Sequence, residues 1–288
     1  MKILSFGETL WDVYTDYALI GGAPLNFAAH AALQGADSWL VTGFGTDELG
    51  EKALSIIKDF GINTDYITIS KEKSTGKCLI TFDKNSTPSY NLLDDAAYDF
   101  IQTPDIKNEH FDILAFGTMA LRHENNIKTI KDIIGMDIFK NIYTDLNIRP
   151  PFYSEETIRI CLENATIVKI SDEELPVVLD AIKINETDVK NAMQILAKKY
   201  PQLKLILITC GANGAFLYDT KAKKEYFTPA AKTEFVSAVG AGDSFGATFL
   251  VSLHNGKSIP DCLSLASKVS AFVVSKNDAV PKYNINNI

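Results

Sequence analysis

Short runs of apolar, largely β-branched residues recur along the 288-residue chain and alternate with stretches of helical periodicity. Several of the runs are continuous, which is typical of strands that are covered on both faces. This alternation predicts an α/β fold with a mostly parallel central sheet. The expected strands are residues 2–6, 38–43, 113–116, 142–145, 167–170, 205–209 and 214–218. The expected helices are residues 24–33, 125–134, 154–163, 188–199 and 244–253.

One region departs from this alternation. Strand patterns at 66–69, 76–82 and 89–92 are separated by polar turns, with no helical pattern between them. We therefore expect an antiparallel patch, too small to hold a core of its own. The chain is interpreted as a single domain, residues 1–288, whose β-sheet lid is formed by about 12–22 and 63–102.

Composition narrows the possible partners. The formal net charge of −8 and the pI of about 5.1 indicate a surface that repels phosphate backbones, so nucleic acid is not expected as a partner. No uncharged apolar stretch reaches the roughly 18 residues of a membrane span, and the start resembles a first strand more than a signal peptide. Four scattered cysteines fit the reduced thiols of a cytoplasmic protein. A phosphate site would need local backbone dipoles and a few placed cations.

The first candidate for chemistry is the stretch Gly240, Ala241, Gly242 and Asp243, where an apolar turn leads into a helix. The small residues let a ligand approach the backbone, and consecutive N–H groups at a helix start form an anion site. Asp243 at the same point could accept a proton from an attacking hydroxyl. Taken alone, the pattern fits an ordinary helix N-cap equally well.

A second candidate begins at Gly21 and Gly22, which precede a helix with Asn26 in its first turn. The Asn26 amide can both donate to and accept from a sugar hydroxyl, although a plain glycine turn would look the same. His30, one turn further on, either lines the same pocket or packs in the core. Asp12 follows the first strand at the sheet edge where α/β proteins bind ligands, and it is either a hydroxyl acceptor or a solvated acid.

Three further loops follow predicted strands. Arg149 projects from a loop stiffened by two prolines, as a phosphate ligand or as an ordinary surface arginine. An acidic cluster that includes Glu174 could hold Mg²⁺ through water or simply begin a helix. The turn from Thr209 to Gly214 is able to approach a nucleotide. The P-loop, the complete dinucleotide fingerprint and the Ser and Cys nucleophile motifs are absent.

Together these segments resemble the two signatures of the PfkB (ribokinase-like) carbohydrate kinases. The resemblance rests on the motif at 21–26, the glycine-rich stretch 43–50 and the stretch 240–243, which occur in the family's order and separation. It extends over nearly the whole chain. Within the family the sequence is most similar to bacterial fructokinases, in the stretches 7–12, 26–32, 116–122 and 145–153.

The resemblance implies a three-layer α/β/α ribokinase-like fold and transfer of the ATP γ-phosphate to a sugar hydroxyl, with Mg²⁺ and often K⁺. By matching position, Asp243 is the implied base, and Gly240, Ala241 and Gly242 are the anion hole, with Arg149 near the transferred phosphate. The implied sugar-binding residues are Asp12, Gly21, Gly22, Asn26 and Arg122. The implied ATP-binding residues are Lys169, Ser171, Thr209, Gly211, Gly214 and Ser267.

Three positions depart from the family pattern, all on the nucleotide and cation side. Ser237 stands where the family usually has an Asp that helps to hold the monovalent cation, which argues against K⁺ activation. Ser171 replaces the Asn of an Asn-x-x-Glu motif, although Glu174, the implied Mg²⁺ contact, remains. Residues 276–279 replace a Pro-Gly-Ala-like run beside the nucleotide. The sugar side and the base match the family.

The predicted activity is therefore that of an ATP-dependent sugar kinase, with fructose as the first substrate to consider. One alternative is a kinase for another hexose or for 2-keto-3-deoxygluconate, whose carboxylate Arg122 could bind. Another is a catalytically weak sugar-binding or sensor protein, suggested by the three departures. The expected partners are a small-molecule sugar and ATP, with no nucleic acid and no membrane, and the chain is expected to be a monomer or a homodimer.

Overall fold

An eight-stranded sheet forms the centre of the computed structural model, which describes residues 1–82 and 88–288. Its strand order is β14-β13-β12-β11-β10-β9-β1-β4. The parallel strands are β1 (Lys2–Phe6), β4 (Asp37–Val41), β9 (Phe111–Phe116), β10 (Phe139–Asp145), β11 (Ile167–Ser171) and β12 (Leu205–Thr209). Two antiparallel strands complete one edge, β13 (Ala215–Asp219) and β14 (Lys224–Thr228).

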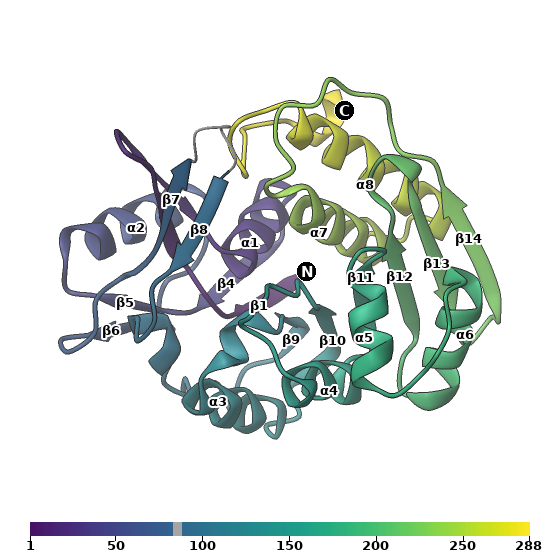
Figure 1. The fold of residues 1–288 in the computed structure, drawn as a ribbon, viewed down its shortest axis with the longest axis horizontal. Coiled ribbons are helices and arrows are strands. Elements are labelled where there is room, and N and C mark those ends of the chain that lie inside the picture. The colour runs from purple at the N-terminus through teal and green to yellow at the C-terminus, as the bar shows by residue number, and fades with distance from the viewer. Residues whose placement is uncertain (83–87) are drawn as a thin grey trace.

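Helices cover both faces of this sheet (Figure 1). One face carries α1 (Ala23–Leu33), α2 (Glu48–Asp59), α7 (Ala241–His254) and α8 (Ile259–Val274). The other carries α3 (Glu124–Ile134), α4 (Glu155–Asn164), α5 (Leu175–Ala181) and α6 (Val189–Lys199). The predicted three-layer α/β/α fold is confirmed. None of the helices in the described residues is long and apolar enough to cross a membrane.

The strands read as continuous apolar runs because successive residues pack into two different cores. Ile3 belongs to the core under α1, α7 and α8, whereas Leu4 belongs to the core under α3 to α6. Leu207 and Ile208 of β12 divide in the same way. Each strand therefore needs apolar side chains on both faces, which is the physical reason for the pattern in the sequence.

A second sheet, with the order β3-β2-β7-β8, stands apart from the central one at the end of the molecule opposite β13 and β14 (Figure 1). Its strands are β2 (Leu10–Val13), β3 (Ala18–Gly21), β7 (Gly76–Phe82) and β8 (Pro88–Leu92). The turn expected between the last two strands lies outside the described residues. We refer to this four-stranded sheet as the small sheet.

The expectation of one antiparallel patch was wrong in two respects. Although β7 and β8 are antiparallel, β2 joins the small sheet parallel to β7. The strand expected at 66–69 is β6 (Thr68–Ser70), which pairs in parallel with β5 (Gly43–Gly45) in a sheet of its own. In both cases the partner strand comes from much earlier in the chain, which a local sequence pattern does not reveal.

Three helices had not been predicted, namely α2, α5 and α8, although two of them carry clear start signals. Asp47 caps α2 by accepting a hydrogen bond from the Gly50 N–H, and Ser258 caps α8 in front of Pro260. Short 3₁₀ turns complete the chain at η1 (Ala97–Phe100), η2 (Met119–Arg122), η3 (Gly211–Asn213) and η4 (Ile285–Asn287).

The close approach of α7 to the sheet depends on Gly246. A Cβ atom at this position would lie 2.2 Å from the hydroxyl oxygen of Tyr143, whose ring is buried and stacked on Phe27. Gly246→Ala should therefore lower the free energy of unfolding by about 1–3 kcal/mol through overpacking. Urea denaturation measures this. Gly135→Ala, at a site with φ near −64° and a nearest atom 3.3 Å away, is the matched control and should change stability by less than about 1 kcal/mol.

Candidate active site

The N-termini of α1 and α7 meet at the carboxyl edge of the central sheet. Asn26, in the first turn of α1, donates a hydrogen bond from Nδ2 to Oδ2 of Asp243 in the first turn of α7, at 2.8 Å. Each helix is capped by a glycine with positive φ, Gly22 at 117° and Gly240 at 79°. A side chain at either position would also meet backbone, because a Cβ on Gly22 would lie 2.4 Å from the carbonyl oxygen of Glu8.

A cavity opens where these helix ends face the ends of β1, β9 and β10. The carboxyl groups of Glu8, Asp145 and Asp243 line it, together with apolar side chains such as Phe27 and Met119. The carboxyl edge of a parallel sheet is where α/β proteins bind ligands. Of the expected site residues Asp243 lines this cavity, whereas Asp12 lies on β2 of the small sheet. The mixture of carboxylates and apolar walls suits a small polyhydroxy compound.

Asp243 has the properties of a general base. Partial burial, with a further contribution from the negative charge of Asp145, raises the pKa of Asp243 to about 6. The hydrogen bond from Asn26 and the positive charges of Lys169 and Arg149 act in the opposite direction. The carboxylate is therefore mostly ionised at neutral pH and is still basic enough to accept a proton from a hydroxyl group.

Glu8 is a second acidic group in the cavity that the sequence argument did not single out. It is 3% exposed, and burial raises its pKa to about 7, with the charge of Asp243 adding to the effect. The backbone N–H groups of Glu8 and Ala23 lower the pKa and so limit this rise. Its place just after β1, with only Gly7 between, indicates a residue at the carboxyl edge of the sheet, but its burial could not be read from the local sequence.

Lys169, an expected nucleotide ligand, lies beneath the anion-hole residues. Its ammonium group donates to both carboxylate oxygens of Asp145, at 2.9 and 2.7 Å, and its side chain is 6% exposed. A Cβ on Gly242 would lie 3.0 Å from Nζ. Although burial alone would lower the pKa of Lys169, the charges of Asp145 and Glu174 raise it, so the group remains a cation. A fixed positive charge therefore supports the segment where phosphate was expected.

Two of the expected sugar ligands lie together on the small sheet. A Cβ on Gly21 would lie 3.3 Å from Oδ2 of Asp12, on the neighbouring strand. Partial burial raises the pKa of Asp12. Among the described residues its carboxylate has no hydrogen-bond or ion-pair partner, which leaves both oxygens free for ligand hydroxyls. Asn26 and Gly22 lie at the start of α1, which directly follows β3.

Ser171 and Glu174 are occupied with each other and with a neighbouring loop. The Ser171 N–H donates to Glu174 Oε2 at 2.8 Å, and the Glu174 N–H donates to Ser171 Oγ at 3.2 Å. Glu174 Oε1 accepts from the Ile148 N–H at 2.7 Å, which ties the loop after β10 to the loop after β11. Nowhere in residues 1–82 and 88–288 do three His, Cys, Asp or Glu side chains gather as a metal site.

The remaining expected nucleotide residues shape loops at the same edge. The Thr209 carbonyl accepts from the Asp172 N–H at 2.8 Å. Gly211 and Gly214 have φ of 50° and 107°, and a Cβ on Gly214 would lie 2.1 Å from the carbonyl oxygen of Thr228. Only glycine therefore fits at position 214, the end of the turn between β12 and β13. A turn without side chains at these positions would also let a ligand approach the backbone closely.

Two serines hold the long connection between β14 and α7. Ser267 on α8 accepts at Oγ from the Ala231 N–H at 2.9 Å and donates to the Pro229 carbonyl at 3.1 Å. Ser237 accepts at Oγ from the Val239 N–H at 3.2 Å. Both hydroxyls therefore stabilise the loop that leads into the expected anion hole.

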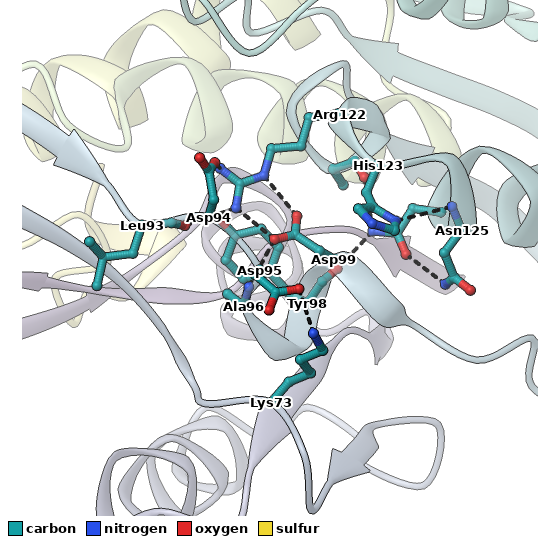
Figure 2. A network of polar contacts seen from close by, with 12 residues as sticks. Lys73, Leu93, Asp94, Asp95, Ala96, Tyr98, Asp99, Arg122, His123 and Asn125 are labelled. Atoms are coloured by element: carbon teal, nitrogen blue, oxygen red, sulfur yellow. Dashed lines mark hydrogen bonds and ion pairs between the residues drawn. The ribbon is translucent and has the colours of Figure 1, made fainter.

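Arg149 and Arg122 lie in very different surroundings. Arg149 is exposed in the loop after β10, close enough to Asp243 for its charge to lower the pKa of that group. Arg122 is 8% exposed at its side chain and donates from Nε and Nη2 to the two oxygens of Asp99, each at 2.7 Å (Figure 2). Its Nη2 also donates to the Leu93 carbonyl at 2.9 Å, and Nη1 lies 3.5 Å from Asp94.

Arg122 and its partners, which we call the Arg122 clamp, hold the segment that leaves the small sheet. The contacts of Arg122 with Leu93 and Asp94, and the ion pair of Lys73 with Asp95 at 2.5 Å, fix the residues just after β8 (Figure 2). Sequence reasoning had expected Arg122 to bind substrate, and the structure shows that Asp99 already neutralises its charge.

Comparison with known proteins identifies the family to which the chain belongs. Residues 7–284 match the pfkB family of carbohydrate kinases, and the chain belongs to that family. A fructokinase of Solanum tuberosum is 26% identical over 97% of this chain and 91% of its own. The structure of a fructokinase with bound ATP from Xylella fastidiosa superposes with a TM-score of 0.86 at 20% identity, covering 99% of this chain and 97% of its own. An uncharacterised sugar kinase from Pyrococcus horikoshii in complex with ATP gives 0.82 at 25% identity, covering 99% and 96%.

Arg122→Met tests the clamp. Removing one partner of a buried pair leaves the Asp99 carboxylate without its counter-charge, so the free energy of unfolding should fall by about 3–5 kcal/mol. The double variant Arg122→Met with Asp99→Asn should recover part of this loss. Urea denaturation is the measurement. Lys183→Met, which breaks an exposed pair with Glu155, is the control and should cost less than about 1 kcal/mol. Equal losses for the two single variants would contradict the clamp.

Asp243 should also show the stability cost of a partly desolvated carboxylate. The pKa of Asp243 in the folded protein is about 6, above the ordinary value of 3.8. The protonated carboxyl therefore favours the folded state at low pH, and this stabilisation is lost as the pH rises through 6. At pH 8, Asp243→Asn should therefore have a free energy of unfolding about 1–2 kcal/mol higher than wild type. Urea denaturation at several pH values is the measurement. The difference should vanish below about pH 4. A variant that is less stable than wild type at pH 8 would contradict this account.

Proposed function

We propose that this carbohydrate kinase phosphorylates fructose, forming fructose 6-phosphate from ATP. The observation that carries the proposal is Asp243, a carboxylate with a raised pKa that Asn26 orients at the N-terminus of α7. A base held among backbone N–H groups suits the attack of a hydroxyl on a phosphoryl group. Similarity to plant and bacterial fructokinases supports fructose as the acceptor.

Each part of the proposed site would have a separate task. Asp12, Gly22 and Asn26 would hold the sugar so that one hydroxyl reaches Asp243, which would accept its proton. The N–H groups of the anion hole, with Lys169 beneath them, would stabilise charge on the transferred phosphoryl group. Arg149, exposed beside the same edge, would add a mobile positive charge.

The side chains available as metal ligands determine how Mg²⁺ and K⁺ would bind. With no group of three potential metal-ligating side chains in the described part of the chain, Mg²⁺ would be held mainly by ATP itself, with Glu174 reaching it through water. When bound, Mg²⁺ neutralises phosphate charge. Ser237 offers a single neutral oxygen already engaged with Val239, so we propose that K⁺ is not required.

The rival substrates and roles find less support. A sugar acid would need a cation with no other partner, and Arg122 is neutralised by Asp99. A sensor without activity would not need the orientated base. The four buried free thiols support a reducing, cytoplasmic location. Oligomeric state, monomer or homodimer, stays a prediction.

A coupled assay of ADP release tests the proposal directly. We expect the highest kcat/KM with fructose among fructose, other hexoses, ribose and 2-keto-3-deoxygluconate. Asp243→Asn should lower kcat by about 10²- to 10⁴-fold because the base is lost, while a fructose-induced rise in Tm persists. ADP release with none of these compounds, despite such a rise in Tm, would instead identify a sugar sensor. Unchanged kcat in the variant would rule out Asp243 as the base.

A further inference from the structure

A buried polar network joins α1 to the C-terminal segment of the chain. His30, in the middle of α1, is fully buried, and its two ring nitrogens face different partners. Nε2 lies 2.9 Å from the carbonyl oxygen of Ala279, and Nδ1 lies 2.9 Å from the hydroxyl of Tyr283. Because a carbonyl oxygen can only accept, Nε2 must carry the proton.

The Tyr283 hydroxyl connects His30 to Gln34. The Gln34 amide nitrogen lies 3.1 Å from this hydroxyl, 3.1 Å from the His30 carbonyl oxygen and 2.9 Å from Oγ1 of Thr248 on α7, so its two N–H groups are shared among three acceptors. Because Nε2 of His30 carries the ring proton, the hydroxyl proton of Tyr283 points at Nδ1. Burial lowers the pKa of His30 to about 4, so the ring is neutral at neutral pH and Nδ1 can accept that proton.

The carbonyl group that His30 holds lies against the cap of the anion hole. A Cβ on Gly240 would lie 2.3 Å from the Ala279 oxygen and 2.9 Å from the Ala279 Cα. Gly240 is buried and takes a left-handed conformation, with φ of 79°, directly before α7. The Ala279 peptide therefore packs directly against Gly240. A shift of this peptide would change the backbone conformation of Gly240, and α7 begins at that residue.

We infer that His30 is a positioning residue that holds the Ala279 carbonyl against Gly240 and so fixes the first turn of α7. The inference rests on the proposed phosphoryl transfer, because that turn carries both the anion hole and Asp243. Residues of α1 would then position the start of α7 in two ways. Asn26 orients the carboxylate directly, and His30 fixes the backbone from which that carboxylate extends.

Two variants of His30 separate the two hydrogen bonds. A glutamine amide reaches the position of Nε2, so His30→Gln can still donate to Ala279. An asparagine amide reaches only the position of Nδ1, so His30→Asn contacts Tyr283 but loses Ala279. Both lose the ring and its stacking on Tyr283. We expect His30→Asn to lower kcat about 5- to 50-fold with sugar KM changed less than about twofold, and His30→Gln to retain most of kcat.

Amide hydrogen exchange supplies a readout that does not depend on activity. In the ligand-free protein, exchange across residues 238–246 should be faster in His30→Asn than in wild type, and close to wild type in His30→Gln. Equal exchange and equal kcat in the two variants would overturn the inference. A wild-type protein without kinase activity would refute the proposed function, while the exchange comparison would still decide the role of His30.

A further variant covers the case in which His30→Asn does not fold. Tyr283→Phe keeps the aromatic ring and removes only the hydroxyl that restrains Nδ1 of His30. It should speed exchange in the same segment and lower kcat by roughly 2- to 5-fold. Exchange and kcat both indistinguishable from wild type would then overturn the inference.

Discussion

The hydrogen bond from Asn26 to Asp243 joins residues that are 217 positions apart in the chain, and the candidate site depends on it. It can form only because α1 and α7 pack on the same face of the sheet and begin at the same edge. Phe27 of α1 and Phe245 of α7 belong to the same buried cluster. The orientation of Asp243, the proposed base, is therefore a consequence of core packing as well as of local sequence.

The same packing creates an electrostatic problem. Glu8, Asp145 and Asp243 line one cavity, and burial raises the pKa of Glu8 and of Asp243 there. Lys169 offsets the negative charge of Asp145 through its two hydrogen bonds to that group. In a chain with a net charge of −8, attraction for a nucleotide has to come from such local cations and from helix N-termini. The raised pKa values of Glu8 and Asp243 are the electrostatic cost of placing several acids in one cavity, and such shifts are common at functional sites.

Local patterns in the sequence predicted the layers of the fold but not every strand partner. Continuous apolar runs indicated buried parallel strands because each face of a strand such as β12 needs its own apolar residues. A strand was predicted at 66–69 and lies at Thr68–Ser70, but its partner was not predicted, since pairing with β5 depends on where β4 leads the chain. Glu8 and the Asp145 partner of Lys169 were missed for the same reason, because burial and contact are set by residues distant in sequence.

Two serines that depart from the family pattern show what the substitutions retain. Ser171 Oγ accepts a hydrogen bond from the Glu174 N–H, and Ser237 Oγ accepts one from the Val239 N–H. Each hydroxyl thus closes a short turn in a loop beside the expected nucleotide, which is a common role for serine. The departures therefore alter what the loops offer to a cation, while the hydrogen bond from Asn26 to Asp243, on which the proposed phosphoryl transfer rests, is present.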